Sequence, residues 1–235
     1  MRNLLLVSSS RVHGTGILEH CQEAIADHFQ GVKTVLFIPY ALADCDKYAH
    51  VIGQALKPIG LSVESIHNSE NPTQSVDQAE AIFIGGGNTF RLLTKLYSQF
   101  LIEPIREAVQ SRGVPYMGSS AGTNMACPTI RTSNDMPIVQ PPTFEALNLI
   151  PFQINPHFID ADPNSTHKGE TREQRLAEYL EDNTVPVAGL REGSWLKVGD
   201  ESCELCGTTG MKFFQRGAEP KEIAAGDVSY LLNPI

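Results

Sequence analysis

The segment PYMGSSAGTNMA, residues 115–126, has the pattern of a turn that presents a serine nucleophile. Gly118, Ser120 and Gly122 fit G-x-S-x-G, with an apolar run before the turn and a helix-forming run after it. On such a strand–turn–helix unit the serine hydroxyl points out of the turn, and the start of the helix stabilises negative charge that develops beside it. The spacing selects Ser120 rather than the neighbouring Ser119. Because this short pattern often arises by chance, it needs partners elsewhere in the chain.

A glycine-rich segment, IGGGNT at residues 84–89, offers backbone amides to a developing oxyanion. It follows an apolar run and precedes a helical pattern. Consecutive glycines let amides approach a ligand closely, so we expect Gly86, Gly87 and Ala121 to form an oxyanion hole and Asn88 to contact substrate. A tight turn without a ligand is the alternative. The segment lacks the last glycine of a dinucleotide fingerprint and the lysine of a phosphate loop.

His157, in the segment INPHF, is the candidate general base. It follows a predicted strand and an Asn-Pro pair, which places it in a turn at the carboxyl end of that strand. A lone histidine is more often structural than catalytic. In an open parallel sheet, however, the active crevice lies at the carboxyl ends of the strands, where the candidate serine and the glycine segment also lie. A serine needs an adjacent base, which favours a catalytic interpretation of His157.

A serine–histidine pair also needs a carboxylate that orients the imidazole and stabilises its cation. Asp135 is near the Ser120 segment in the chain, whereas Glu192 comes just after the predicted strand that ends at Leu190. Proximity in sequence favours Asp135, and the position at the strand end favours Glu192. The sequence leaves both candidates open.

Metal chemistry is a weaker interpretation of the same region. His157, Asp160, Asp162 and His167 lack the spacing of a helical zinc-binding histidine pair and form no strong ligand framework. The CELC segment at 203–206 has no second cysteine pair, so two small residues in a hairpin explain it better than zinc or redox chemistry. We expect no metal and no cofactor.

Alternating short apolar runs and longer amphipathic segments predict a single α/β domain over residues 1–235. Strands rich in Val, Ile and Leu, separated by helices, indicate a parallel sheet covered on both faces. Segment 194–217 instead reads as antiparallel hairpins at one edge of that sheet. The strand runs begin at Asn3, Lys33, Leu61, Ala81, Val114, Phe152 and Val185, and the predicted helices span Ile17–Phe29, Asp44–Pro58, Asn88–Tyr97, Leu101–Ser111, Ser120–Ala126 and Lys168–Glu181.

Composition excludes several classes of protein. A formal net charge of -9, with Lys and Arg scattered singly, argues against a nucleic-acid partner. The apolar runs are only strand-length, so none predicts a membrane span, and the run in MRNLLLV is too short for a signal peptide. The 5 cysteines are odd in number and irregularly spaced, unlike a secreted disulfide framework. We expect a cytoplasmic protein that is a monomer or a small homo-oligomer.

The chain resembles the peptidase E family of α-aspartyl dipeptidases, which are serine peptidases related to cyanophycinases. The resemblance is densest in FIGGGNTFRLL, GSSAGTNMACPTIRTSNDMPIV, QINPHF, HKGETREQR and GLREGSW. It implies a three-layer, flavodoxin-like fold similar to class I glutamine amidotransferases. Those amidotransferases have Cys at the turn and a His-x-Glu pair, whereas this chain has Ser120 and, two residues after His157, Ile159. The resemblance supports Ser120 and His157, and both Asp135 and Glu192 fall within matching segments.

The resemblance also implies a reaction, the hydrolysis of Asp-Xaa dipeptides through an acyl-enzyme on Ser120. An aspartate substrate needs a cation, and Arg suits it because it pairs bidentately and stays charged. Arg131 is the first candidate and Arg172 the second, while Glu170 or Asp160 would meet the substrate's amino group. Two alternatives are another serine hydrolase of the same fold, acting on β-aspartyl substrates, and a non-catalytic protein that binds a small molecule.

Overall fold

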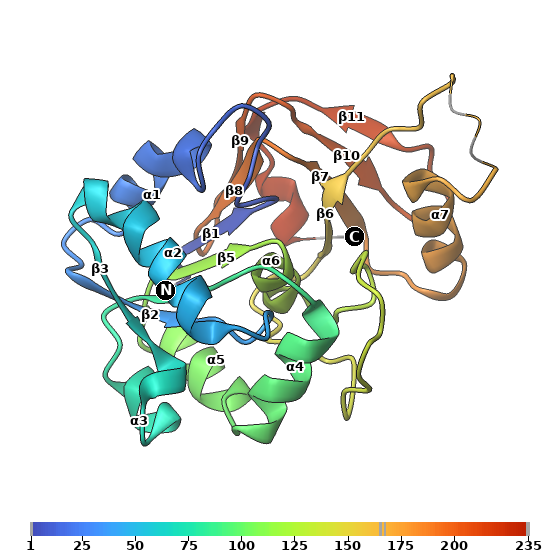
Figure 1. Ribbon diagram of the computed structural model, residues 1–235. Helices are drawn as coiled ribbons and strands as arrows, with labels where there is room; N and C mark the ends of the chain where they lie inside the picture. Colours follow the sequence, from blue (N-terminus) through green and yellow to red (C-terminus); the bar gives the residue numbers. More distant parts are fainter. Residues whose placement is uncertain (1, 165, 167, 234–235) are drawn as a thin grey trace.

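An eight-stranded sheet forms the centre of the protein, in the order β12-β9-β8-β1-β5-β4-β2-β3 (Figure 1). The computed structural model describes residues 2–164, 166 and 168–233. Strands β1, β5, β4, β2 and β3 are parallel, and β8, β9 and β12 add to the β1 side in antiparallel pairs. The strands span β1 Leu4–Val7, β2 Thr34–Ile38, β3 Ser62–Ser65, β4 Ile82–Ile84, β5 Tyr116–Ser119, β8 Ser194–Val198, β9 Cys203–Gly207 and β12 Gly226–Asp227.

Helices cover both faces of this sheet, which makes the three layers of the predicted fold class. Along β1, Leu4 and Leu6 pack in one apolar core and Leu5 and Val7 in another, because successive side chains of a strand point to opposite faces. The first core includes residues of α3 Pro72–Asp77, α4 Thr89–Ser98, α5 Ile102–Gln110 and α6 Ala121–Ala126; the second includes residues of α1 Gln22–His28 and α2 Cys45–Leu56. The fold class expected from the sequence is confirmed.

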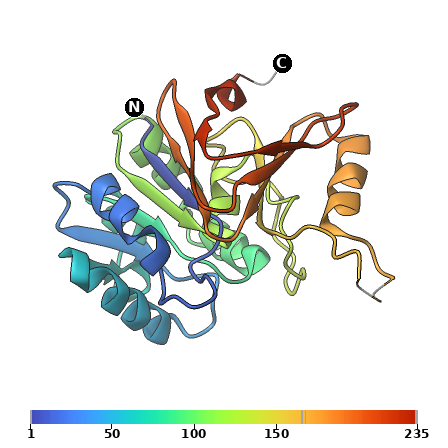
Figure 2. The same cartoon turned by 90° about the horizontal axis from the view of Figure 1, so that it is seen from above.

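A second, four-stranded sheet was not expected. Its order is β11-β10-β7-β6, and it lies beside the main sheet with α7 Arg172–Asp182 packed against it (Figure 2). The prediction of one sheet is therefore wrong for β6 and β7, which pair with each other, and the C-terminal hairpins divide between the two sheets. These strands span β6 Gln153–Phe158, β7 Val187–Arg191, β10 Met211–Phe214 and β11 Lys221–Ile223.

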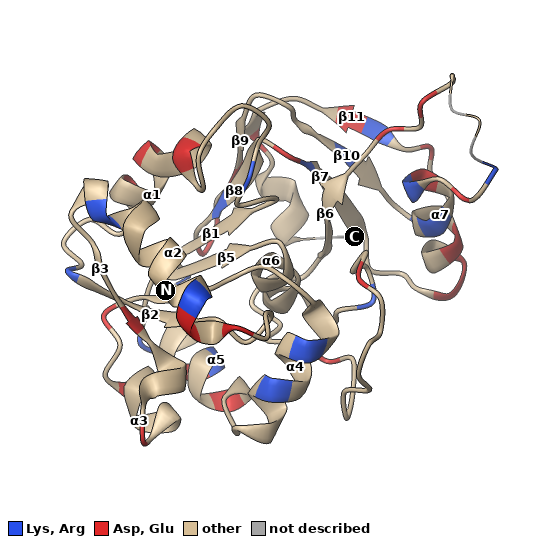
Figure 3. Cartoon of the chain, viewed as in Figure 1, with Lys and Arg blue, Asp and Glu red and all other residues tan. Residues whose placement is uncertain are grey.

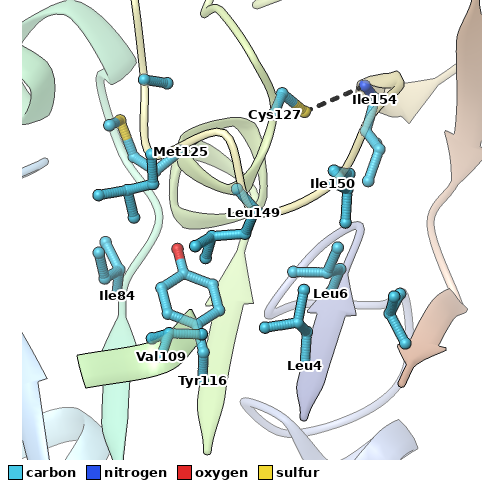
Figure 4. Close-up of a cluster of buried hydrophobic side chains, with 14 of the residues drawn as sticks. Leu4, Leu6, Ile84, Val109, Tyr116, Met125, Cys127, Leu149, Ile150 and Ile154 are labelled. Carbon is cyan, nitrogen blue, oxygen red and sulfur yellow. Dashed lines mark hydrogen bonds between the residues drawn. The ribbon is translucent and has the colours of Figure 1, made fainter. Parts of the chain in front are cut away.

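The apolar core that includes residues of β5 and α6 also contains the completely buried phenol of Tyr116 (Figure 4). The Tyr116 hydroxyl donates to the carbonyl oxygen of Gly122 at 2.6 Å, so the buried polar group is satisfied. The Cys127 sulfur accepts a hydrogen bond from the amide of Ile154 at 3.2 Å. This contact links the end of α6 to β6 of the second sheet.

Three helices differ from the sequence prediction. Helix α1 begins at Gln22 rather than Ile17, because Glu19–Cys21 forms a separate 3₁₀ turn before it. Helix α7 begins at Arg172 rather than Lys168, because Thr171 and Gln174 form a capping box: each side chain accepts from the other's backbone amide, at 3.1 and 2.8 Å. Helix α3 was not predicted; it is a six-residue helix started by Asn71 and Pro72.

Helix α7 carries both acidic and basic residues (Figure 3). Among the described residues, no helix has the length and apolar character needed to cross a membrane.

Gly122 fits its place in α6 only because it has no side chain. A Cβ there would lie 2.0 Å from the carbonyl oxygen of Ile84, whereas a Cβ on Gly53 of α2 would meet no atom within 4 Å. We expect Gly122→Ala to destabilise the protein by at least about 3 kcal/mol through overpacking, and Gly53→Ala to stabilise it by about 0.5–1 kcal/mol through helix propensity. Urea unfolding of both variants measures the two effects. Equal stabilities would contradict the packing of α6 on β4.

Candidate active site

Ser120 lies on the sharp turn between β5 and α6. Its backbone has φ 54° and ψ -109°, a conformation that non-glycine residues rarely adopt. The backbone amide of Ser120 donates a hydrogen bond to the carbonyl oxygen of Val7 at 3.0 Å, and this bond holds the turn in place. Ser119 is completely buried, whereas Ser120 lines a cavity. The structure therefore presents the hydroxyl that the spacing of the motif had selected.

His157 comes from the second sheet, at an irregularity in β6. The pairing of β6 with β7 shifts register between Pro156 and Phe158, and His157 itself has φ 54°. Its amide donates to the Ser8 hydroxyl at 2.9 Å, and that hydroxyl donates to the carbonyl oxygen of Leu190 at 2.8 Å. The bulge turns the imidazole out of the strand toward the main sheet, a common use of bulges at active sites.

The imidazole of His157 joins Ser120 to Glu192. Its Nε2 lies 2.8 Å from the Ser120 Oγ, and its Nδ1 lies 2.6 Å from Glu192 Oε1. Glu192 follows β7 directly, and its carbonyl oxygen accepts from the Thr209 hydroxyl at 2.6 Å. The side chains of His157 and Glu192 are 34% and 47% exposed, so the pair is open to small molecules. This is the geometry of a serine–histidine–carboxylate triad, which can carry out acyl transfer.

Asp135, the other candidate carboxylate, contacts a different group. Its Oδ2 accepts from the Thr89 amide at 2.8 Å, from the Thr89 hydroxyl at 2.6 Å and from the Ser133 hydroxyl at 3.2 Å. Asp135 thus holds the first residue of α4 and makes no hydrogen bond to His157. Its Oδ1 has no partner among the described residues, and the side chain lines the same cavity as Ser120.

The glycine segment lies against the serine, but its amides are not equally available. A Cβ on Gly86 would lie 3.0 Å from the Cβ of Ser120. The Gly86 amide, expected in an oxyanion hole, donates to the Tyr48 hydroxyl at 2.8 Å. Within the described part of the chain, the amides of Gly87 and Ala121 have no acceptor. Gly87 has φ 133°, which a side chain would strain, so the local structure requires glycine there.

The side chain of Asn88 makes hydrogen bonds within the protein at both of its polar atoms. Its Oδ1 accepts from the Arg91 amide at 3.0 Å, which caps α4, and its Nδ2 donates to the carbonyl oxygen of Met136 at 2.9 Å. Both ends of the side chain are therefore used to fix the loop after the glycine segment. Asn88 thus has a structural role in the loop, and its contact with substrate stays a prediction.

The two candidate arginines lie in different surroundings. Arg131 is exposed, and its guanidinium lies 5.0 Å from the centre of the Phe144 ring. Neither Arg131 nor Arg172 is among the residues that line the cavity at Ser120. Arg172 is the first residue of α7 and is partly buried. Burial lowers its pKa, and the charges of Arg175 and Asp135 act on it in opposite directions, lowering and raising that pKa. The charge of the Asp135 carboxylate therefore acts on Arg172, although these two described side chains make no hydrogen bond to each other.

The acidic residues expected to meet the substrate's amino group are both paired with arginine. Asp160 receives two hydrogen bonds from Arg191, at 2.7 and 2.9 Å, and these bonds lower the pKa of Asp160. Glu170 lies 3.6 Å from Arg175. Asp162 accepts from the Asn164 amide, and His167 lies outside the described residues. Over residues 2–164, 166 and 168–233, no group of three potential metal ligands occurs.

A cavity of about 1080 Å³ opens above the triad. Besides Ser120, His157 and Glu192, its lining includes three cationic side chains that were not among the predicted site residues, Arg11, Lys47 and Arg91, and the imidazole of His13. Arg11 and His13 come shortly after β1, at the carboxyl end of a parallel strand, which is also where Ser120 and the glycine segment lie. Lys47 and Tyr48, in contrast, lie in a helix where no local pattern marks them, so only the structure reveals them.

Comparison with known proteins gives the family of the chain. The chain is 53% identical to a protein named Peptidase E from Streptomyces coelicolor, over 98% of this chain and 95% of that one. It is 51% identical to a "Probable alpha-aspartyl dipeptidase" from Drosophila melanogaster, over 98% of both. The crystal structure of a peptidase from an acI-B1 Actinobacterium has the same fold, with a TM-score of 0.68 at 19% identity, over 96% of this chain and 95% of that one. The model of the family described as "Peptidase family S51" matches residues 4–206, and the chain therefore belongs to this family.

Proposed function

We propose that this protein is a serine-type dipeptidase that hydrolyses Asp-Xaa dipeptides through an acyl-enzyme on Ser120. The observation that carries the proposal is the chain of contacts from Ser120 to His157 to Glu192, at 2.8 and 2.6 Å. The proposed substrate class is supported by the family and by the name of a relative, the probable alpha-aspartyl dipeptidase of Drosophila melanogaster.

Each residue has a defined part in the reaction. The Ser120 oxygen attacks the carbonyl carbon after the aspartate, and His157 Nε2 takes the serine proton. Glu192 holds the opposite ring nitrogen and stabilises the imidazolium. The amides of Gly87 and Ala121 stabilise the tetrahedral oxyanion, and each such donor is worth about 3–4 kcal/mol. His157 then protonates the leaving amine, and the same base activates the water that releases aspartate.

Substrate recognition rests on unpaired charges beside the triad. We assign the free Oδ1 of Asp135 to the α-ammonium of the substrate, because this oxygen belongs to a fixed carboxylate that lines the cavity. Arg172 replaces Arg131 as the partner of the aspartate side chain, since it is partly buried and lies near Asp135. The cavity cations Arg11 and Lys47 remain available to the second substrate carboxylate.

The whole chain is proposed to work as one catalytic domain in the cytoplasm, as a monomer or a small homo-oligomer, without metal or cofactor. Ser120 lies on the main sheet and His157 on the second, so neither sheet carries the triad alone. The cysteines are all free thiols, as is usual for proteins of reducing compartments.

A panel of dipeptides in the presence of a chelator tests the substrate class. We expect release of free aspartate from Asp-Leu, at least about tenfold slower hydrolysis of Glu-Leu and β-Asp-Leu, and none of Leu-Leu. Preference for β-Asp-Leu would favour a cyanophycinase-like hydrolase instead. Loss of activity in chelator would contradict a metal-independent serine mechanism.

The same assay tests Arg172. Arg172→Met should lower kcat/KM for Asp-Leu by about 10- to 100-fold, because the substrate carboxylate loses its cation. Arg131→Met is the matched control and should retain nearly full activity. If Arg131→Met lowers kcat/KM and Arg172→Met does not, Arg131 is the residue that binds the substrate's aspartate side chain.

A further inference from the structure

Of the four consecutive backbone amides from Gly85 to Asn88, three donate hydrogen bonds within the protein. The fourth is available to a ligand. The Gly85 amide donates to the carbonyl oxygen of Ile38 at 3.2 Å, and the Asn88 amide donates to that of Ala41 at 2.9 Å. The Gly86 amide donates to the Tyr48 hydroxyl at 2.8 Å. Among the described residues the Gly87 amide has no acceptor. The direction of the Gly87 N–H bond is therefore set by the hydrogen bonds of Gly85, Gly86 and Asn88. Among these three, only the bond of Gly86 has a side chain as its acceptor, that of Tyr48.

Packing fixes the position of the Tyr48 hydroxyl. The ring lies edge-on to Phe37 of β2, with ring centres 5.0 Å apart and planes at 83°. On the other side, a Cβ on Gly85 would lie 2.6 Å from the hydroxyl oxygen, so the glycine makes room for it. Burial raises the pKa of Tyr48 to about 12, so the phenol is neutral at ordinary pH. The hydroxyl is a rigid, uncharged acceptor at the edge of the cavity.

The residue that Tyr48 holds lies beside the nucleophile, with little room for a side chain between them. A Cβ on Gly86 would lie 3.0 Å from the Ser120 Cβ and 3.6 Å from its Oγ. Misplacement of a catalytic group by about 1 Å can cost 10²-fold in rate. A loop this close to Ser120 therefore has to be held accurately if the Gly87 amide is to meet the oxyanion.

We propose that Tyr48 is a positioning residue for the oxyanion site: its hydroxyl accepts the Gly86 amide and so aims the Gly87 amide at the oxygen that becomes negative when Ser120 attacks. The inference rests on the proposed function only in requiring Ser120 to be the nucleophile. It does not depend on which peptide is the substrate.

Tyr48→Phe tests the inference because it removes the acceptor and keeps the ring. We expect kcat for Asp-Leu to fall by about 10- to 100-fold with KM changed by less than about threefold, since the oxyanion exists only after attack. The rate of Ser120 labelling by a fluorophosphonate should fall by a similar factor, because its phosphoryl oxygen occupies the same site. The matched control is Tyr97→Phe, which removes a hydroxyl bonded to the carbonyl oxygen of Glu145 at 3.1 Å, outside the cavity. It should label at the wild-type rate.

The labelling rate separates this inference from the choice of substrate. If the wild type labels but hydrolyses no aspartyl dipeptide, the dipeptidase proposal fails and the labelling comparison still tests Tyr48. A Tyr48→Phe rate within twofold of wild type, or a rise in KM alone, would overturn the inference. Should Tyr48→Phe fold poorly, the labelling rate constant is measured on its folded fraction after size-exclusion chromatography; a value within twofold of wild type there would also overturn the inference.

Discussion

Ser120→Ala is expected to lower kcat for Asp-Leu by about 10⁴- to 10⁶-fold, the largest effect of any single substitution in this protein. The hydroxyl forms the covalent bond to the acyl group, and no other described side chain lies within hydrogen-bond reach of His157 Nε2. Steady-state release of aspartate measures the loss. Intact-mass spectrometry after fluorophosphonate treatment should show one adduct in the wild type and none in the variant.

Ser119→Ala is the matched control for this experiment. Ser119 is completely buried, and its hydroxyl has no hydrogen-bond partner among the described residues. Removing an unsatisfied buried hydroxyl is nearly neutral for stability, so the variant should fold, label and hydrolyse as the wild type does. An unlabelled Ser119→Ala protein with a normal melting temperature would mean that the motif had been assigned in the wrong register. A fully active Ser120→Ala protein would exclude the acyl-enzyme.

The parallel part of the fold was predictable because its signals are local. Strand β4 is a buried apolar run, Gly85 ends it, and Asn88 caps the helix that follows. Each of these features depends on residues within a few positions of one another. The same is true of the β5–Ser120–α6 turn, where the small residues needed for close packing are visible in the sequence.

The second sheet was not predictable in the same way, because strand partners are chosen at long range. β7 and β8 are separated only by Glu192 and Gly193, yet they belong to different sheets. Their apolar patterns do not encode that divergence; it arises where Gly193, with φ 87°, turns the chain from one sheet to the other. The position of Glu192 after a strand could be predicted from the sequence, but its contact with His157 could not.

The site was predictable where one residue at a strand end decides the chemistry, as at Ser120 and His157. It was not predictable where several polar residues follow strands and compete for one partner. Asp135 is nearer to Ser120 in sequence, but Thr89 and Ser133 satisfy its Oδ2. Tyr48 gave no signal, because its hydroxyl acts from a helix on a loop 38 residues away.

Glu192→Gln and Asp135→Asn should separate the two carboxylates by the step that each one impairs. Glu192→Gln removes the charge that stabilises the imidazolium and allows the wrong ring tautomer. We therefore expect kcat to fall by about 10²- to 10⁴-fold, with KM nearly unchanged. Fluorophosphonate labelling should slow as well, since it needs the same base.

Asp135→Asn is expected to act on binding instead. The asparagine oxygen still accepts from the Thr89 amide, so α4 keeps its contact, but the substrate ammonium loses its counter-charge. KM for Asp-Leu should rise by about tenfold or more, and the preference for Asp-Leu over N-acetyl-Asp-Leu should fall, while labelling of Ser120 stays at the wild-type rate. If Asp135→Asn instead slowed labelling as much as Glu192→Gln, Asp135 would act on His157 and the ammonium site would lie elsewhere. If labelling responds to Glu192 alone, the carboxylate that comes later in the chain completes the triad and the earlier one selects the substrate.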